Sequence, residues 1–534
     1  MQGFPPLLLL PSALLLLLHP FAPVHGGRVL VFPGEYSHWL NMRSIMEELV
    51  RRNHSVTVLV SDASPSINYN KSRDTKFNFM VFKVPYSRSE FHGLTQELVH
   101  LSMNEFHVWS PLQKFSRMFD WTRRSVQLGT RQCDSMLKNE QLLAALRSAG
   151  FDAVLLDPMV MCGDLVADVL GLPLIVSLRF SFGGVLERHC GHAPAPPSYV
   201  PAAPLPYRDR MTFVERLVNV MTYVSTSVMT ELFWRVTLDK YYSEVKGSPS
   251  SACETLGKAD IWLIRTFWDI ETPRPLPPNF KYVGGLHCKP ANQLPEDMDA
   301  FMQSSGDAGV VVVSFGSMVT NLTTERADVI AAAFGRIPQK VIWRFKGKTP
   351  KTLAANTKLC DWLPQNDLLG HPKTRAFVTH GGTNSLYEAV YHAVPLVGVP
   401  LFGDQPDNLA RLSRRGAAIV LDFNHLTADE LTEALHAVIN QPGYRSSMQH
   451  LSALHHDQPV APLSTAVFWV EFVMRHGGAQ HLRLASHDLN WFQYHSLDTA
   501  AALLVVMTTA SALCWAGICC FLRSCRGGGR EKSD

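Results

Sequence analysis

The chain has 534 residues, more than one ordinary hydrophobic core accommodates, so we expect two domains. Hydrophobic residues make up 46% of it and charged residues 18%, which is typical of a globular protein with some membrane sequence and excludes a disordered chain. The net charge is only +3, without a long basic block, which argues against nucleic acid as a partner.

The two ends of the chain predict targeting and anchoring. Residues 1–26 hold a short leucine-rich stretch followed by small residues, typical of a cleaved secretory signal peptide. An uncleaved anchor is less favoured, because prolines interrupt the stretch. Residues 499–521 carry no charge and are long enough to cross a bilayer; aromatic residues precede them and arginines follow. The positive-inside rule then places residues 522–534 in the cytosol and the bulk of the chain in the lumen.

A lumenal location makes the sequons at Asn53, Asn70 and Asn321 candidates for glycosylation. The chain has ten cysteines, and the six outside the membrane segment are scattered without CxxC or metal-ligand spacing. The lumen permits disulfides, but the spacing predicts no particular pair.

The first half of the chain alternates strands and helices. The first strand, a helix whose apolar residues repeat from Met42, and a second strand form a βαβ unit. No GxGxxG joins that strand to its helix, which disfavours dinucleotide binding there. Residues 64–150 are interpreted as irregular. The predicted strands are 28–32, 55–60, 153–156 and 174–177, with a helix over 163–170.

The second half repeats the alternation after a proline-rich linker at 272–279. An α/β fold of two doubly wound domains follows, with the cleft between them as the default ligand site. The strands predicted in this half are 310–314, 340–343, 376–379 and 396–399.

The run from Trp362 to Gln405 combines the parts that a nucleotide sugar needs. A strand enters a Gly-Gly turn and then a helix, so backbone amides and a positive helix end can meet a diphosphate. A tryptophan supplies a flat surface on which a nucleobase can stack, and a glutamate and an Asp-Gln pair supply acceptors for sugar hydroxyls. Each feature alone has a structural explanation, but together they predict a nucleotide-sugar site. The residues in these roles are Trp362, Gln365, His380, Gly381, Gly382, Glu388, Asp404 and Gln405.

This run resembles the signature of the UDP-glycosyltransferases. The segments VVVVSFGSMVTNLTTER, VGGLHCKP, IPQKVIWRFKG, PLFGDQPDN and NWFQYHSLD are similar to vertebrate UDP-glucuronosyltransferases, closer to their second family than to their first. The resemblance covers essentially the whole chain. It implies two Rossmann-like domains in the GT-B arrangement, residence in the endoplasmic reticulum membrane, UDP-glucuronate as co-substrate with no bound cofactor, small lipophilic acceptors, and homo- or hetero-oligomers with related enzymes.

The resemblance also implies a domain division and a donor site. Residues 27–280 would bind the acceptor, 281–450 the UDP-sugar, and 451–498 would return toward the N-terminal domain. Relatives often have glycine where Ser385 stands, which makes donor affinity the property to test. The implied UDP-sugar residues are Arg265, Ser314, Arg344, Trp362, Gln365, His380, Gly381, Gly382, Asn384, Ser385 and Glu388, with Asp404 and Gln405 holding the sugar.

Transfer to a hydroxyl needs a base, and His38 is the candidate. It follows the first strand at a helix N-terminus, and an imidazole titrates near neutral pH. Asp157 ends a strand at the same edge of the predicted sheet and would orient the ring, whereas Asp152 lies at the opposite end. The family resemblance supports both residues. We expect direct displacement with inversion, with charge developing on the diphosphate near His380.

Several alternatives stay open. Asp297 and Asp299 form a literal DxD, but it lies beside the linker, so a solvated helix start is expected and no protein-bound metal; Mg²⁺ could accompany the donor. UDP-glucose or another UDP-sugar could replace UDP-glucuronate, because the sequence locates no cation for the carboxylate. A non-catalytic partner that regulates active relatives is the other alternative. The acceptor pocket should come from residues 64–125 and the stretch after Arg179, and its acceptor is not identified.

Overall fold

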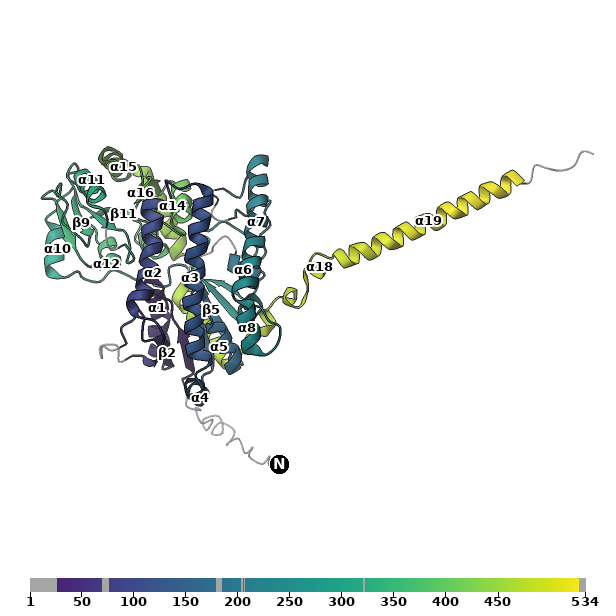
Figure 1. Cartoon of the computed structure of the whole chain (residues 1–534). Helices are drawn as coiled ribbons and strands as arrows, with labels where there is room; N and C mark the ends of the chain where they lie inside the picture. The colour runs from purple at the N-terminus through teal and green to yellow at the C-terminus, as the bar shows by residue number, and fades with distance from the viewer. Residues whose placement is uncertain are drawn as a thin grey trace, which may run out of the picture.

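The computed structural model describes residues 26–69, 76–178, 185–202, 205, 207–319 and 322–527. Two α/β domains stand side by side, and a long helix projects from one of them (Figure 1). The predicted signal peptide, apart from Gly26, lies outside the described residues, as do Asn70 and Asn321. Asn53 is described and its side chain is exposed. The predicted fold of two doubly wound domains is confirmed.

The first sheet has seven described strands in the order β3-β2-β1-β4-β5-β6-β7, all parallel. β1 lies between β2 and β4, with Val29 paired to Val56 on one side and Ala153 on the other. The strands are nearly continuous apolar runs because helices cover both faces. The strands are β1 (Arg28–Phe32), β2 (Ser55–Ser61), β3 (Asn78–Phe82), β4 (Ala153–Leu156), β5 (Leu174–Leu178), β6 (Ile261–Ile264) and β7 (Phe280–Tyr282).

The second sheet has six described parallel strands in the order β10-β9-β8-β11-β12-β13. Its order reverses next to β8 and β11, where a doubly wound sheet opens a crevice at the carboxyl ends of its strands. The strands are β8 (Val310–Ser314), β9 (Lys340–Arg344), β10 (Thr357–Cys360), β11 (Thr374–Thr379), β12 (Leu396–Gly398) and β13 (Ala418–Val420).

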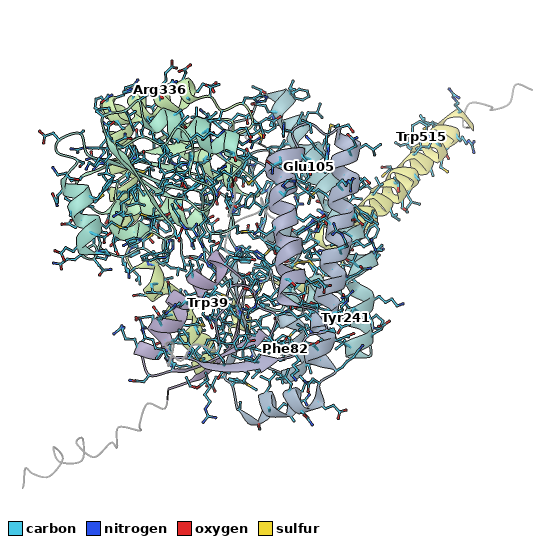
Figure 2. All side chains as sticks on the ribbon, turned by 60° about the vertical axis from the view of Figure 1, so that its left-hand side comes forward. Trp39, Phe82, Glu105, Tyr241, Arg336 and Trp515 are labelled. Atoms are coloured by element: carbon cyan, nitrogen blue, oxygen red, sulfur yellow. A yellow bond between two sulfur atoms is a disulfide. The ribbon has the colours of Figure 1, made fainter. Side chains whose placement is uncertain are left out.

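Helices connect these strands and bury one face each. Trp39 of α1 and Phe82 at the end of β3 are both buried in the first domain (Figure 2). The first domain contains α1 (Ser37–Arg51), α2 (Arg88–His100), the π-helical turn η2 (Leu101–Glu105), α3 (Pro111–Leu137), α4 (Glu140–Ser148), α5 (Gly163–Leu170), α6 (Val185–His189), α7 (Phe213–Thr237), α8 (Asp239–Lys246) and α9 (Ala252–Gly257). The second contains α10 (Glu296–Gln303), α11 (Thr324–Phe334), α12 (Gln365–Leu369), α13 (Thr383–Tyr391), α14 (Gln405–Arg414), α15 (Ala428–Asn440) and α16 (Pro442–His456).

The interpretation of residues 64–150 as irregular is wrong. The segment contains β3, α2, α3 and α4, and α3 alone has 27 residues. A capping box marks the start of α3, with Ser110 and Gln113 satisfying each other's backbone amides and Pro111 in the first turn. That pattern is readable from sequence. The helix that follows the capping box is hard to recognise in the sequence, because half-buried aromatic and charged residues alternate along its surface.

The chain returns to the first domain after completing the second. Ala466, Val467, Val470 and Val473 of α17 (Pro462–His476) are buried in the same core as α1 and the strands of the first sheet. The crossing from one sheet to the other follows Tyr282, since β7 still pairs with β6. The first domain is therefore discontinuous in sequence, and its core is complete only with α17, which follows the second domain.

Two disulfides form in the first domain, joining Cys133 to Cys162 and Cys190 to Cys253. Their partners are 29 and 63 residues apart in sequence. Only the packing of α3 against α5, and of α6 near α9, brings these sulfurs together, which explains why spacing predicted no pair.

The long projecting helix is α19 (Leu497–Gly527), preceded by η3 (Gln480–Leu482), η4 (Ala485–Asp488) and α18 (Trp491–Tyr494). Within Leu497–Arg526 a stretch of 18 residues reaches a mean hydropathy of 2.0, and none of that stretch is buried against the protein. Trp515 stands on this helix away from both domains (Figure 2). Its length and composition fit the predicted membrane anchor.

Candidate active site between the two domains

The carboxyl edge of the first sheet brings His38 and Asp157 together. β1 leads into the first turn of α1, which carries His38, and Asp157 directly follows the neighbouring strand β4. The Nδ1 atom of His38 lies 2.7 Å from Oδ2 of Asp157. A Cβ atom on Gly34 would lie 2.7 Å from Cβ of His38 and 2.9 Å from Oδ2 of Asp157, so the turn between β1 and α1 requires glycine there.

The Asp157 carboxylate is fully buried, whereas the His38 side chain is 15% exposed. Burial alone would raise the pKa of Asp157, but the charge and hydrogen bond of His38, the nearby Arg265 and the amide of Met159 together hold it below its ordinary value. Asp157 is therefore an anion that orients the imidazole through Nδ1, the arrangement that a histidine base needs.

Arg265 lies in the first domain beside this pair. Its Nε and Nη2 atoms donate to Oγ of Ser177 at 3.0 and 2.6 Å, and Nη2 is 3.9 Å from Oδ2 of Asp157. Its place in the UDP shell, which the family resemblance implies, stays a prediction. The contacts given above place its guanidinium beside the dyad and β5.

The donor half is built where β11 enters α13. Gly381 has φ of +87°, and a Cβ atom there would lie 2.4 Å from Cγ of Leu409, so both conformation and space demand glycine. Gly382 is the N-cap of α13, and no side chain caps its amides. This turn can therefore present backbone N–H groups and a positive helix end to an anion.

The predicted ribose acceptor and its neighbours form one hydrogen-bonded group. Nε2 of Gln365 donates to Oε2 of Glu388 at 2.5 Å and to Oγ of Ser385 at 3.0 Å. Burial raises the pKa of Glu388 to about 7, against the lowering effect of the Gln365 hydrogen bond. Trp362 is 68% exposed, which excludes a core role for this tryptophan.

Asp404 and Gln405 lie at the start of α14, and both are engaged. Oδ2 of Asp404 accepts from Oγ1 of Thr383 at 2.9 Å and from Nδ2 of Asn408 at 2.6 Å. Oε1 of Gln405 accepts from the amides of Leu401 and Phe402. Asp404 thus joins the start of α14 to α13, and Gln405 joins it to the loop after β12, which fixes the positions of both side chains.

The remaining predicted donor residues meet around Gly316. Arg344 donates from Nη1 to the carbonyl of Gly316. Ser314, at the end of β8, and His380 are buried. A Cβ atom on Gly316 would lie 2.5 Å from Nε2 of His380, so glycine allows the β8 loop to approach the imidazole. These contacts place the carboxyl ends of β8, β9 and β11 at one point.

The dyad and the donor turn come together across the domain boundary. Nδ2 of Asn41, one turn beyond His38 on α1, donates to Oδ1 of Asn384 on α13 at 2.7 Å. Nε2 of His287 lies 3.2 Å from the carbonyl oxygen of Asn384 and 3.8 Å from Oε1 of Glu388. Sequence reasoning missed Asn41 and His287, although His287 lies within one of the family-like segments. The contact puts the predicted base opposite the predicted diphosphate site.

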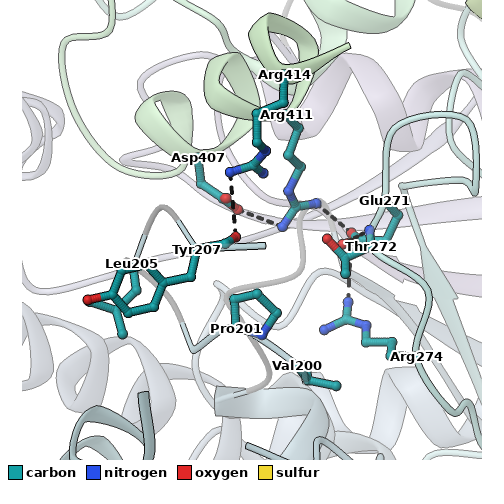
Figure 3. A pocket seen from close by; sticks show the side chains of 10 residues that line it. All are labelled: Val200, Pro201, Leu205, Tyr207, Glu271, Thr272, Arg274, Asp407, Arg411 and Arg414. Atoms are coloured by element: carbon teal, nitrogen blue, oxygen red, sulfur yellow. Dashed lines mark hydrogen bonds and ion pairs between the residues drawn. The ribbon is translucent and has the colours of Figure 1, made fainter. Parts of the chain in front are cut away.

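A second polar group lies between the domains (Figure 3). Nη1 of Arg411 is 2.7 Å from Oε2 of Glu271, and Nη2 is 2.6 Å from Oδ2 of Asp407. Nη2 of Arg274 is 3.7 Å from the same Glu271 oxygen. The cavity there holds about 20 Å³, room for roughly one water molecule, so it is not a nucleotide-sugar site. Its ion pairs instead fix α14 against the interdomain segment.

The literal DxD occupies a different place. Asp297 and Asp299 lie in the first turn of α10, where Asp297 pairs with Lys358 at 2.9 Å and Asp299 with His371 at 3.2 Å. Among the residues that the structure describes, no group of three or more His, Cys, Asp or Glu side chains is arranged to hold a metal ion. These two aspartates are therefore explained by ion pairs at a helix start.

Comparison with known proteins decides the family. The sequence model described as "UDP-glucoronosyl and UDP-glucosyl transferase" matches residues 27–530. The chain belongs to this family. UDP-glucuronosyltransferase 2A2 of Homo sapiens is 52% identical over 511 residues, covering 95% of this chain and 94% of that protein. UDP-glucuronosyltransferase 2A1 of Rattus norvegicus is 51% identical over 489 residues, covering 91% of this chain and 92% of that protein.

Solved structures confirm the GT-B arrangement of the transferase. The glycosyltransferase VinC in complex with DTDP has a TM-score of 0.55 at 20% identity, covering 84% of this chain and all (100%) of that one. UGT2 of Phytolacca americana, complexed with UDP-2fluoro-glucose and pterostilbene, has a TM-score of 0.55 at 17% identity with coverage of 84% and 100%. Its family membership makes the chain an enzyme that transfers sugars from UDP-sugars, as the sequence predicted. Its C-terminal helix fits a membrane anchor.

Proposed function

We propose that this enzyme transfers glucuronate from UDP-glucuronate to hydroxyl or carboxyl groups of small lipophilic acceptors, with inversion. His38 takes the proton from an acceptor hydroxyl, the oxygen attacks the anomeric carbon, and UDP leaves with the bonding electrons. A carboxyl acceptor reacts as its carboxylate. The observation that carries the proposal is the 2.7 Å contact between Nδ1 of His38 and the buried Asp157.

The geometry supports each role in this displacement. Asp157 holds Nδ1, so Nε2 is the nitrogen that accepts the proton, and the carboxylate stabilises the imidazolium that forms. The amides of α13, with His380 beside them, stabilise charge on the departing diphosphate. Trp362 offers an exposed face to the uracil, and Glu388 offers acceptors to the ribose. Mg²⁺, where present, would enter with the diphosphate, and the protein's own residues need no metal for these steps.

The identity of the donor sugar is the most specific part of the proposal. The matching relatives are named UDP-glucuronosyltransferases, which favours glucuronate, while the family description also includes glucosyl transfer. Glucuronate and glucose differ at C6, so selection of glucuronate over glucose depends on a cation near that position. UDP-glucose therefore remains the competing donor.

We place the enzyme in the endoplasmic reticulum membrane with both domains lumenal. The two disulfides need an oxidising compartment, and basic residues close the membrane helix at Arg523 and Arg526. Asn53, exposed beside β2, is the described sequon that glycosylation would reach. Association with copies or relatives is part of the same proposal.

The test uses the purified full-length chain in detergent. UDP-glucuronate and UDP-glucose compete at equal concentration over a panel of phenols, alcohols and acids, and mass spectrometry identifies the products. We expect mainly glucuronides. His38→Ala should lose most of the turnover of hydroxyl acceptors while still binding UDP, whereas the exposed His450→Ala should behave like the unaltered enzyme. Near-normal turnover in His38→Ala would refute the base, and predominantly glucosylated products would refute the donor assignment.

A further inference from the structure

α7 presents an apolar face to solvent. Phe213, at its start, is 72% exposed and Val236, near its end, is 79% exposed. The exposed apolar residues recur every three or four positions, so they form one stripe along the helix. They are Phe213, Val214, Leu217, Val220, Met221, Val224, Val228, Met229, Leu232 and Val236.

The opposite side of the same helix is held against the protein. Asn219 is fully buried; its Oδ1 accepts from the amide of Ala202, and its Nδ2 donates to the carbonyls of Pro197 and Val200. Oγ of Ser227 accepts from Nη2 of Arg188 on α6 at 2.8 Å. Trp234 packs against the core of the first domain, and the Arg188 guanidinium lies over the ring of Tyr223. α7 is therefore anchored by mixed polar and aromatic contacts on its inward side and is apolar on its outward side as well.

Charge is confined to the ends of this helix. Glu215 and Arg216 lie in its first turn and Glu231 and Arg235 in its last two, and residues 217–230 contain no charged side chain. Fourteen residues of helix extend over roughly 20 Å. An uncharged apolar face of that length is uncommon on the surface of a protein surrounded only by water.

The face lies next to the base of the membrane anchor. The His192 ring stacks on His487 with ring centroids 4.0 Å apart, and its Nδ1 lies 3.0 Å from Oγ of Ser486. This clamps η4, shortly before α19, against the segment that also accepts the Asn219 hydrogen bonds. Figure 1 shows α7 along the edge of the first domain from which α18 and α19 leave. The aromatic residues of α18, including Trp491, are also exposed, and α18 directly precedes the anchor helix α19.

We propose that α7 is a second membrane contact, resting on the bilayer beside α19 with its outward apolar stripe among the lipid headgroups and upper acyl chains. An interfacial helix gains by burying such a stripe, and the inward side of α7 already contacts the protein, which leaves the outward stripe for lipid. The clamp between His192 and η4 keeps the domain close to the membrane surface. The first domain is thus held at two places.

The experiment uses the full-length chain reconstituted into phosphatidylcholine vesicles that contain a phosphatidylcholine with a diazirine on its acyl chain. After illumination and proteolysis, mass spectrometry locates the lipid adducts. We expect adducts in Phe213–Thr237 as well as in Leu497–Arg526, with the α7 yield about ten-fold above that of the water-facing helix α15. Adducts confined to α19 would overturn the proposal.

Matched variants sharpen the result. Val224→Lys with Val228→Lys should reduce labelling of α7 to the level of α15 and leave labelling of α19 unchanged. Leu454→Lys with Val460→Lys, at exposed apolar positions of the other domain, should leave both unchanged. Unchanged α7 labelling in the first pair would contradict the proposal. So would chain-to-chain cross-links through α7 in place of lipid adducts, since these would show a second copy covering the stripe.

Discussion

Asp157→Asn isolates the charge that orients the proposed base. The substitution keeps the size of a side chain with no exposed surface, 2.7 Å from Nδ1 of His38. An amide cannot stabilise the imidazolium as a carboxylate does, and it can donate to Nδ1, which favours the tautomer that places the proton on Nε2. We therefore expect a defect in kcat, with little change in the KM for the UDP-sugar.

The expected size follows from the geometry. With about 4 Å between the charge centres and an effective dielectric constant near 20, the carboxylate stabilises the imidazolium by roughly 4 kcal/mol. Loss of that stabilisation in the transition state corresponds to about a thousand-fold lower kcat. The assay is steady-state turnover of a phenolic acceptor by the detergent-solubilised full-length enzyme at saturating UDP-glucuronate.

Asp152→Asn is the matched control. Asp152 lies at the opposite end of β4, where its Oδ2 accepts from the amide of Arg28 at 2.6 Å, remote from His38. It should retain near-normal kcat. A loss of less than about ten-fold in Asp157→Asn, or ~1.4 kcal/mol, would mean that the charge pair does not act in the rate-limiting step.

Three further predictions concern stability and domain coupling. Burial raises the pKa of Glu388 from 4.5 to about 7, so between these pH values the folded enzyme holds a proton that the unfolded chain loses. The unaltered enzyme therefore loses stability as the pH rises through this window, whereas a glutamine does not titrate. Glu388→Gln should become more stable than the unaltered enzyme there, by up to roughly 3 kcal/mol. Removing the Cys190–Cys253 disulfide by double substitution to serine should cost about 4 kcal/mol, because it closes a loop of 63 residues, measured by denaturant unfolding. Asn41→Ala, which removes the 2.7 Å bond to Asn384, should raise the KM for the UDP-sugar about three- to ten-fold, since one interdomain hydrogen bond stabilises by about 1 kcal/mol.

Each of these has a contradicting result. A melting-temperature difference between Glu388→Gln and the unaltered enzyme that stays constant from pH 5 to 8 would exclude the raised pKa. Equal unfolding of the oxidised enzyme and the serine variant would show that the disulfide constrains nothing. An unchanged donor KM in Asn41→Ala, with Asn139→Ala on the far side of the first domain as the control, would separate the α1–α13 contact from donor binding.

The fold class and the candidate residues of the site could be predicted from the order of the amino acids alone. Apolar runs separated by helix-length segments predicted strands such as β4 and β8 with their observed bounds, because buried parallel strands need continuous apolar sequence. The Gly381-Gly382 turn was recognisable as two glycines between a strand and a helix, and Gly381 adopts a positive φ that favours glycine. Features of this kind depend on residues that are consecutive in the chain, so they can be recognised without the structure.

Which residues from distant parts of the chain meet could not be predicted without the folded molecule. The pairing of Cys133 with Cys162, the position of Arg265 beside Asp157 and the bond between Asn41 and Asn384 join residues from different strands or domains. The outward apolar face of α7 also needed the structure, because periodicity shows that a helix has two faces but not which one meets the core. Contacts of this kind depend on how whole elements pack, and no local pattern in the chain encodes that arrangement.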